Sequence, residues 1–197
     1  DPRNRCARVR GENPVTRATL TVLRAEGFGG RFRLLETTNP FHAPKPEPGQ
    51  FVHVKVGGAF LRRPISLAGA SEKTLRMFFA VKGKGTAALA RAEKGDALDA
   101  IGPLGNGFPT DDVQEETILA AGGVGIGPVA FLAQRLIERK KTFSFFYGAK
   151  TRAELFPALL PEGGYETVLC TDDGSAGEKG TVPERIEARL AQRACGV

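Results

Sequence analysis

The hydrophobic pattern of this chain changes its period once, near residue 111, and this change limits the possible folds more than any other feature. Before it, short apolar runs alternate between two faces; in the run over 75–81, Leu75, Met77, Phe79 and Val81 share one face, as in a β-strand. After it, a continuous apolar run leads to a glycine turn and then to a helical run. The change predicts an antiparallel barrel followed by an α/β domain.

The first half is expected to form a six-stranded antiparallel Greek-key barrel. Its 25 glycines and 13 prolines, counted over the whole chain, fall in clusters between apolar runs, as the turns of a barrel require. Closing the sheet removes exposed strand edges. The strands are expected over Ala18–Leu23, Phe32–Thr37, Phe51–Val56, Arg62–Leu67, Thr74–Val81 and Asp96–Ile101, with one helix over Ala87–Ala92.

The second half predicts a parallel-sheet nucleotide-binding α/β domain. Its strands are expected over Thr117–Ala121, Thr142–Tyr147 and Glu166–Thr171, and its helices over Val129–Lys140 and Glu184–Gln192. Pro109 and a run of acids interrupt the apolar pattern over 108–116, which we interpret as the linker. The expected division is therefore a barrel domain over 1–108 and an α/β domain, incomplete at its C-terminus, over 109–197.

Charge and cysteine content narrow the classes of partner and compartment. A formal charge of +6 and an arginine-rich start suit anionic partners. With no Trp and two Tyr, however, the chain has few aromatic side chains on which nucleic-acid bases could stack. A basic barrel that binds nucleic acid is therefore a remote alternative. Three dispersed cysteines give neither a disulfide framework nor metal-ligand spacing. No apolar run reaches the roughly 18–20 residues of a membrane span. We expect a soluble cytoplasmic protein that binds neither nucleic acid nor membrane.

Two segments of the barrel half are candidates for one diphosphate site. In Arg63-Pro64-Ile65-Ser66, the planar guanidinium can hold two phosphate oxygens and the serine can offer a hydroxyl. Gly83-Lys84-Gly85-Thr86 leads into the expected helix, where a Thr cap and unpaired amides would meet a phosphate. An Arg-Pro pair at a sheet edge and a plain capped turn are the structural alternatives. A separation of about twenty residues favours a shared ligand.

A glycine loop in the second half is a candidate nucleotide site. Gly122-Gly123-Val124-Gly125-Ile126-Gly127-Pro128 follows an apolar strand and opens a helix, with Pro128 expected at the first helical position. Pro128 replaces the third glycine of the standard fingerprint, and the next strand ends in Tyr147-Gly148-Ala149-Lys150, without the usual ribose-binding acid. Thr171-Asp172-Asp173-Gly174-Ser175 ends the third strand, at the same expected edge. From these residues alone, the two segments are interpreted either as a nucleotide site or as structural turns.

Taken in order, six segments resemble the ferredoxin-reductase superfamily, and within it the electron-transfer subunit of type B dihydroorotate dehydrogenase. They are Pro48-Gly49-Gln50-Phe51, Arg63-Pro64-Ile65-Ser66, Gly83-Lys84-Gly85-Thr86, Gly102-Pro103-Leu104-Gly105-Asn106-Gly107-Phe108, Gly122-Gly123-Val124-Gly125 and Thr171-Asp172-Asp173-Gly174-Ser175. The segment over 102–108 and the pattern ending at Lys179-Gly180 separate this subunit from general flavin reductases. The likeness covers almost the whole chain.

The resemblance implies an FAD-dependent NAD(P)H oxidoreductase subunit. It would form a hetero-oligomer with an FMN-containing catalytic subunit that oxidises dihydroorotate in pyrimidine biosynthesis. Arg63 would hold the FAD diphosphate, Ile65 would pack on the isoalloxazine, and Ser66 would approach its reactive edge, with no side chain acting as acid or base. The FAD site so implied comprises Arg63, Pro64, Ile65, Ser66, Phe78, Phe79, Ala80, Gly85 and Thr86, and the NAD site comprises Gly122, Gly123, Gly125, Asp172, Asp173, Gly174 and Ser175.

The sequence departs from the family in two places. Phe79-Ala80 stands where members often have Tyr-Arg. The family also continues into a four-cysteine [2Fe-2S] domain, whereas this chain stops at Cys195-Gly196-Val197 with no local set of four cysteines. Three interpretations follow: a fragment, electrons that leave by another route, or a docking subunit.

Two further alternatives stay open. One alternative function is that of another NAD(P)H oxidoreductase subunit of the same superfamily, serving ferredoxin, sulfide or hydrogenase chemistry. Lys150 and Arg152 could also accommodate the 2′-phosphate of NADP, so that only the family likeness favours NAD.

Overall fold

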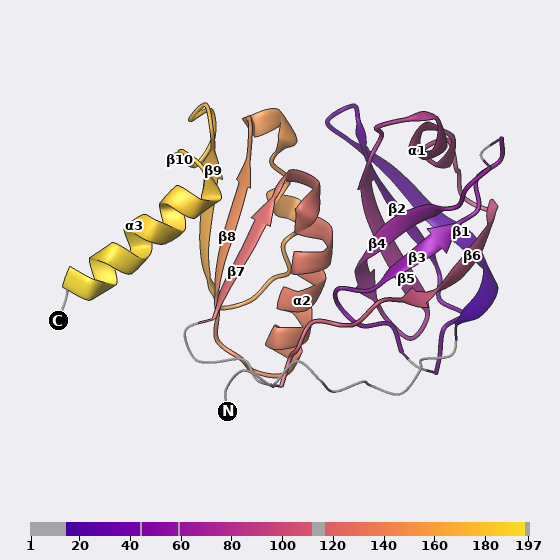
Figure 1. Ribbon diagram of the computed structural model, residues 1–197, viewed down its shortest axis with the longest axis horizontal. Coiled ribbons are helices and arrows are strands. Elements are labelled where there is room, and N and C mark those ends of the chain that lie inside the picture. The colour runs from indigo at the N-terminus through magenta and orange to yellow at the C-terminus, as the bar shows by residue number, and fades with distance from the viewer. Residues whose placement is uncertain (1–14, 44, 59, 112–116, 196–197) are drawn as a thin grey trace.

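A closed barrel and a parallel α/β domain lie side by side in the computed structural model (Figure 1). The structure describes residues 15–43, 45–58, 60–111 and 117–195, without the side chains of 193–195. The arginine-rich start and the acidic part of the expected linker lie outside the described residues. The barrel ends at Leu104 and the parallel sheet begins at Ile118, and the division at residue 108 stays a prediction.

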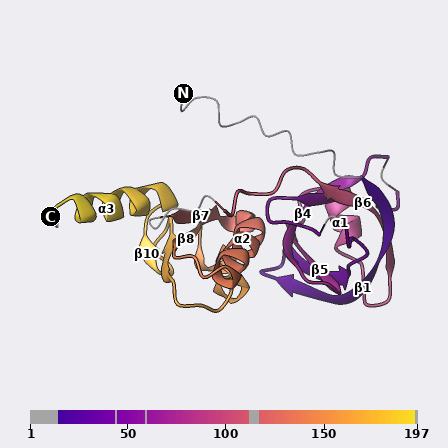
Figure 2. The same ribbon diagram turned by 90° about the horizontal axis from the view of Figure 1, so that it is seen from below.

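The barrel has the six antiparallel strands that the alternating pattern predicts. They are β1 (Thr16–Phe28), β2 (Phe32–Thr38), β3 (Phe51–Val54), β4 (Arg63–Ala70), β5 (Thr74–Ala80) and β6 (Ala97–Leu104). The order β1-β2-β5-β4-β3-β6 closes on itself through the pairing of β1 with β6 (Figure 2). Every described pair in the barrel is antiparallel, and the strand order, with β5 between β2 and β4, confirms the Greek-key barrel.

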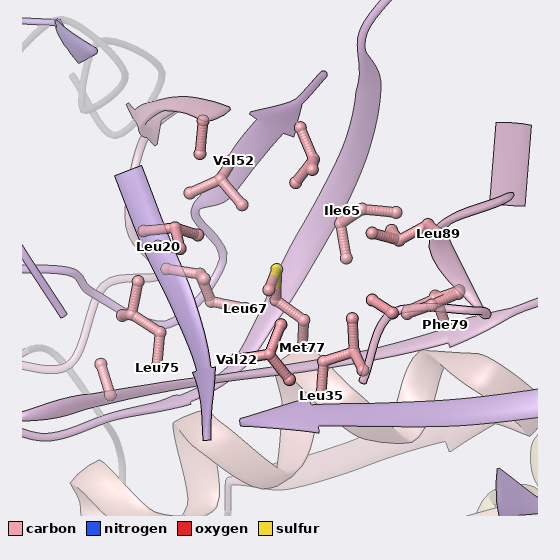
Figure 3. Packing of buried hydrophobic residues seen from close by; sticks show 14 of the residues in the cluster. Leu20, Val22, Leu35, Val52, Ile65, Leu67, Leu75, Met77, Phe79 and Leu89 are labelled. Carbon is pink, nitrogen blue, oxygen red and sulfur yellow. The ribbon is translucent and has the colours of Figure 1, made fainter. Parts of the chain in front are cut away.

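Alternate side chains of the strands fill the barrel interior. Leu75, Met77 and Phe79 point inward from β5, as their spacing predicts, whereas Val81 lies beyond the end of the strand (Figure 3). Leu89 comes from the short helix α1 (Lys84–Leu89) and is also buried in this core. The helix therefore packs on the barrel core, as expected for a helix that covers its end.

The α/β domain has a four-stranded sheet in the order β10-β9-β8-β7, with all pairs parallel. Its strands are β7 (Ile118–Gly122), β8 (Ser144–Ala149), β9 (Glu166–Thr171) and β10 (Glu178–Lys179), and its helices are α2 (Ile126–Glu138) and α3 (Val182–Cys195). Short 3-10 helices cover Gly123–Gly125 (η2), Arg152–Glu154 (η3) and Pro157–Leu159 (η4). The parallel sheet confirms the expected fold class, but β10 and the 3-10 helices are too short to leave a periodic signal.

An apolar interface joins the two domains. Phe32 of β2 stacks on Phe78 of β5, with ring centroids 5.8 Å apart, and Phe156 of the α/β domain packs edge-on against both rings. Gly127 in the first turn of α2 lies against β4, because a Cβ added there would be 3.3 Å from the Cβ of Ala68. The start of α2 is thus fixed on the outer face of the barrel.

The two helices that follow the glycine segments, α1 and α2, begin three residues earlier than expected. Gly83, not Thr86, is the N-cap of α1, and Thr86 caps from within the first turn because its Oγ1 accepts hydrogen bonds from the amides of Lys82 and Gly83. Pro128 is the third residue of α2 instead of the first, a position where the missing amide proton still costs no helical hydrogen bond. Among the described residues, no helix has the length and apolar character that crossing a membrane requires.

Candidate flavin and nucleotide sites

The structure brings Arg63 and Gly85 into direct contact, although they come from different segments. The Arg63 side chain lies over Gly85 in the first turn of α1, so that a Cβ at residue 85 would overlap Nε and lie 2.8 Å from Cζ. Arg63 Nη1 donates to the carbonyl of Leu61 at 3.0 Å on the exposed side. The guanidinium therefore lies next to the unpaired amides of a helix start, and both can donate to one diphosphate.

The neighbouring Arg62 has a different, structural role. Its Nη2 donates to both oxygens of Asp99, at 3.0 and 2.9 Å, and its Nη1 donates to the Asp99 carbonyl at 2.9 Å. Arg17 also pairs with Asp99, and the hydrogen bonds from Arg17 and Arg62 lower the pKa of Asp99 to about 2. Because Arg62 is held by β6, Arg63 is the arginine of the pair that is left for a ligand.

The outer face of β4 connects the two candidate sites. Pro64 and Ser66 are exposed on this face, and the next outward residue, Ala68, contacts Gly127 at the start of α2. The two-residue step from Ser66 to Ala68 covers ~7 Å along a strand. The outward residues of β4 therefore lie between the Arg63 end of the strand and the start of α2.

The side chains of four residues in the expected FAD site do not face it. Ile65 and Phe79 alternate with the outward residues and are buried in the barrel core, and Phe78 is buried in the aromatic interface. Ala80 is also buried on the interface side. The structure thus revises the expectation that the Ile65 side chain packs on the isoalloxazine: at these four positions only the backbone is left for a ligand.

The glycine loop opens onto a pocket of about 340 Å³ at the carboxyl ends of the parallel strands. Gly122 and Gly123 line it from the end of β7, Lys150 from the end of β8 and Asp172 from the end of β9. A Cβ at Gly122, Gly123 or Gly125 would meet no atom within 4 Å, and Gly123 has a φ of +50°. The loop therefore presents bare backbone to the pocket at a helix N-terminus, the arrangement that binds nucleotide phosphates.

Only one residue of the predicted Asp172–Ser175 segment lines this pocket. Asp173 accepts hydrogen bonds from the amide and hydroxyl of Ser175, at 2.9 and 2.6 Å, which lower the pKa of Asp173. Ser175 Oγ in turn accepts from the amide of Arg152 at 2.8 Å. With Gly174 at a φ of +76°, these three residues form the turn that supports the neighbouring loop, while Asp172 faces the pocket.

Two pocket features escaped the sequence analysis. Glu154 lines the pocket from η3, and its carboxylate forms an ion pair with Arg31 from the β1–β2 turn of the barrel. Tyr147 is buried next to the glycine loop, where its hydroxyl accepts from the Phe156 amide at 3.2 Å and lies 3.4 Å from the Gly123 carbonyl. Burial raises the pKa of Tyr147 to about 12. Both residues fix the loops around the glycine turn.

The donor set suits organic cofactors. Within the described part of the chain, no group of three or more His, Cys, Asp or Glu could hold a metal ion. The three cysteines of the sequence do not supply the four thiolates that a [2Fe-2S] cluster needs. Arg63 over Gly85 and the bare glycine loop both fit dinucleotide phosphates.

A closed antiparallel barrel, an arginine over a glycine helix start and a parallel nucleotide domain define a ferredoxin-reductase-type flavoprotein. A solved NADH-dependent reduced ferredoxin-NADP oxidoreductase is 26% identical, with a TM-score of 0.79 over 88% of this chain and 63% of that one. A ferredoxin NADP+ reductase from Neisseria gonorrhoeae, solved with FAD and NADP, shares the fold at 20% identity and a TM-score of 0.69, covering 91% of this chain and 79% of that one. No family model matches the chain.

The chain belongs to the family of dihydroorotate dehydrogenase B (NAD(+)) electron transfer subunits. The subunit from Geobacillus thermodenitrificans is 36% identical over 180 residues, which cover 88% of this chain and 70% of that protein. The subunit from Geobacillus kaustophilus is 40% identical over 161 residues, which cover 76% of this chain and 63% of that protein. The chain thus spans less than two thirds of the length of the latter relative.

Proposed function

We propose that this chain binds FAD on its barrel and NAD on its α/β domain, and that it carries electrons between NAD and a catalytic subunit. The contact of Arg63 with Gly85 is the observation that carries the proposal. It joins the two barrel segments expected to share one diphosphate, and the exposed residues of β4 lie between this contact and the start of α2.

The barrel residues would hold FAD without acid or base chemistry. Arg63 would pair with the diphosphate together with the first amides of α1, while Thr86 keeps the turn in shape through its own hydrogen bonds. Pro64 and Ser66 offer the exposed outer face of β4. When bound, FAD supplies the exchange of a two-electron hydride for single electrons.

The α/β residues would bind and orient the nicotinamide nucleotide. The amides that follow Gly122 would take its phosphates at the positive end of α2. Lys150 and Asp172 follow the ends of the neighbouring strands β8 and β9, line the same pocket and would contact polar groups of the nucleotide. Glu154 adds a negative charge, partly balanced by Arg31.

The partner and the setting are the finer part of the proposal. By family membership, the partner would be the FMN-containing catalytic subunit that oxidises dihydroorotate in pyrimidine biosynthesis, within a hetero-oligomer. A [2Fe-2S] cluster of that complex needs four cysteine thiolates, so the three cysteines of this sequence could not hold it alone. The buried free thiol of Cys170 suits the reducing cytoplasm.

Anaerobic reduction tests the activity. The FAD-reconstituted protein should lose its flavin absorbance when NADH is added, and Arg63→Ala should lose FAD at concentrations that saturate the wild type. A protein that retains FAD but is bleached by neither NADH nor NADPH would contradict the proposal.

Reconstitution with the catalytic subunit tests the partner. Dihydroorotate should then reduce the flavin of this chain. The similarity to the NADH-dependent ferredoxin-NADP oxidoreductase favours one competing function, a ferredoxin-linked reductase. Reduction by NADH and reduced ferredoxin, without any reduction by dihydroorotate, would support that function instead.

A further inference from the structure

A second pocket, of about 460 Å³, lies at the end of α2 opposite the glycine loop. Both domains line it: Asn39 and Phe41 follow β2, Lys73 lies in the β4–β5 turn, and Arg135 lies in the last turn of α2. From Ile126 to Arg135 the helix rises ~14 Å. The pocket is therefore separate from the nucleotide pocket at the start of the same helix (Figure 1).

The floor of this pocket is apolar and held in place. Phe41 and Ala70 are buried, with 3% and 8% of their surface exposed. The buried Asn39 side chain joins the two loops, because Nδ2 donates to the Ser71 carbonyl at 2.7 Å and Oδ1 accepts from the Phe41 amide at 2.9 Å. These hydrogen bonds hold the segment after β2 against the β4–β5 turn.

The rim of the pocket carries an excess of positive charge. The residues that line the pocket include Lys45, Lys73 and Arg135 and a single acid, Glu72, whose carboxylate lies 3.6 Å from the Lys45 ammonium. Lys73 forms no ion pair with any residue that the structure describes. Arg135 Nη1 donates to Glu138 at 2.8 Å, but its Nε is buried without a hydrogen-bond partner. The rim therefore retains the unpaired positive charge of Lys73 beside the partly paired guanidinium of Arg135.

We propose that this pocket binds a small organic carboxylate with an apolar body. Arg135 would pair with the carboxylate, since a guanidinium can donate two parallel hydrogen bonds to it, and Lys73 would add a second charge. Phe41 and Ala70 would contact the apolar body, an interaction that a bare inorganic anion cannot make. Because the rim belongs to both domains, the bound carboxylate would join the barrel to α2. This site lies outside the proposed path of electrons.

Titration calorimetry on the full-length, FAD-saturated protein tests the site, with 2-naphthoate, 2-naphthol and inorganic phosphate as probes at constant ionic strength. We expect saturable one-to-one binding of 2-naphthoate and at least tenfold weaker binding of the other two. Lys73→Gln and Arg135→Gln should each weaken 2-naphthoate binding at least fivefold. Lys94→Gln, which removes an exposed charge in the α1–β6 connection, should leave it unchanged.

Equal affinity of the wild type and Lys73→Gln would overturn the proposal, and so would phosphate that binds as tightly as 2-naphthoate. If Arg135→Gln fails to fold after losing its contacts with Glu138 and Phe131, the affinity of the Lys73→Gln variant still tests the proposal, because Lys73 is exposed. Bleaching by NADH, measured on the same samples, reports separately on electron transfer.

Discussion

Replacing Gly85 by alanine separates helix stability from flavin binding. Alanine favours a helix over glycine by ~1 kcal/mol, and the backbone at residue 85 has no positive φ, so α1 itself should gain stability. The added Cβ would nevertheless overlap Nε of Arg63 and force the guanidinium off the helix start. Loss of a charged hydrogen bond to the diphosphate costs about 1.5–3 kcal/mol, which corresponds to an about 10- to 150-fold higher Kd for FAD.

Flavin fluorescence during titration of the apoprotein measures this Kd, and thermal unfolding of the apoprotein measures the stability. Gly83→Ala is the matched control, because a Cβ at Gly83 would meet no atom within 4 Å and its backbone is extended. An unchanged Kd in Gly85→Ala, or an equal loss in Gly83→Ala, would refute the role of the contact between Arg63 and Gly85.

Three further changes test the structure around the sites. Tyr147→Phe leaves the buried Phe156 amide without its acceptor, and urea titration should show a loss of about 1–3 kcal/mol in unfolding free energy; no loss would mean that the amide finds another acceptor. The folded pKa of Asp99, about 2, lies below its ordinary value of 3.8, so its stabilising effect is present above about pH 4 and disappears as the pH falls toward 2. Urea titrations between about pH 2 and 6 should therefore show a smaller loss of stability in acid for Asp99→Asn, and an identical pH profile would count against the pairing with Arg62. Phe78→Ala removes a buried ring between the domains and should cost about 3–5 kcal/mol by chemical denaturation; a cost below about 1 kcal/mol would contradict the packing.

Periodicity predicted the architecture wherever one face of an element is buried. The spacing of Leu75, Met77 and Phe79 identified the interior face of β5 because these side chains fill the barrel. The pattern failed where burial does not alternate: β1 continues to Phe28, but most of its residues after Leu23 are exposed and leave no two-residue signal. The early starts of α1 and α2 were missed because their first turns contain glycines, Gly85 and Gly127, which have low helix propensity and carry no side chain to show a helical period.

Residue chemistry predicted the parts of the site that use backbone and charge, and not the direction of individual side chains. A guanidinium and a glycine helix start can both bind a diphosphate, which predicted that Arg63 and Gly85 lie close together, as they do. Ile65 was expected at the flavin, yet it shares the strand face of the buried Leu67, which its two-residue spacing already indicated. Glu154 lies in a 3-10 turn without periodicity, and an acid shortly after the second strand was its only signal.

The phenylalanine contacts between the barrel and Phe156 also affect how the molecule unfolds. Phe28, Phe32 and Phe78 belong to the same apolar cluster as the sheet and helix of the other domain. Exposing that cluster would remove buried surface from both halves at once, so neither half can melt early without weakening the other. Scanning calorimetry should consequently record one cooperative endotherm for the whole chain, with agreement between the van't Hoff and calorimetric enthalpies.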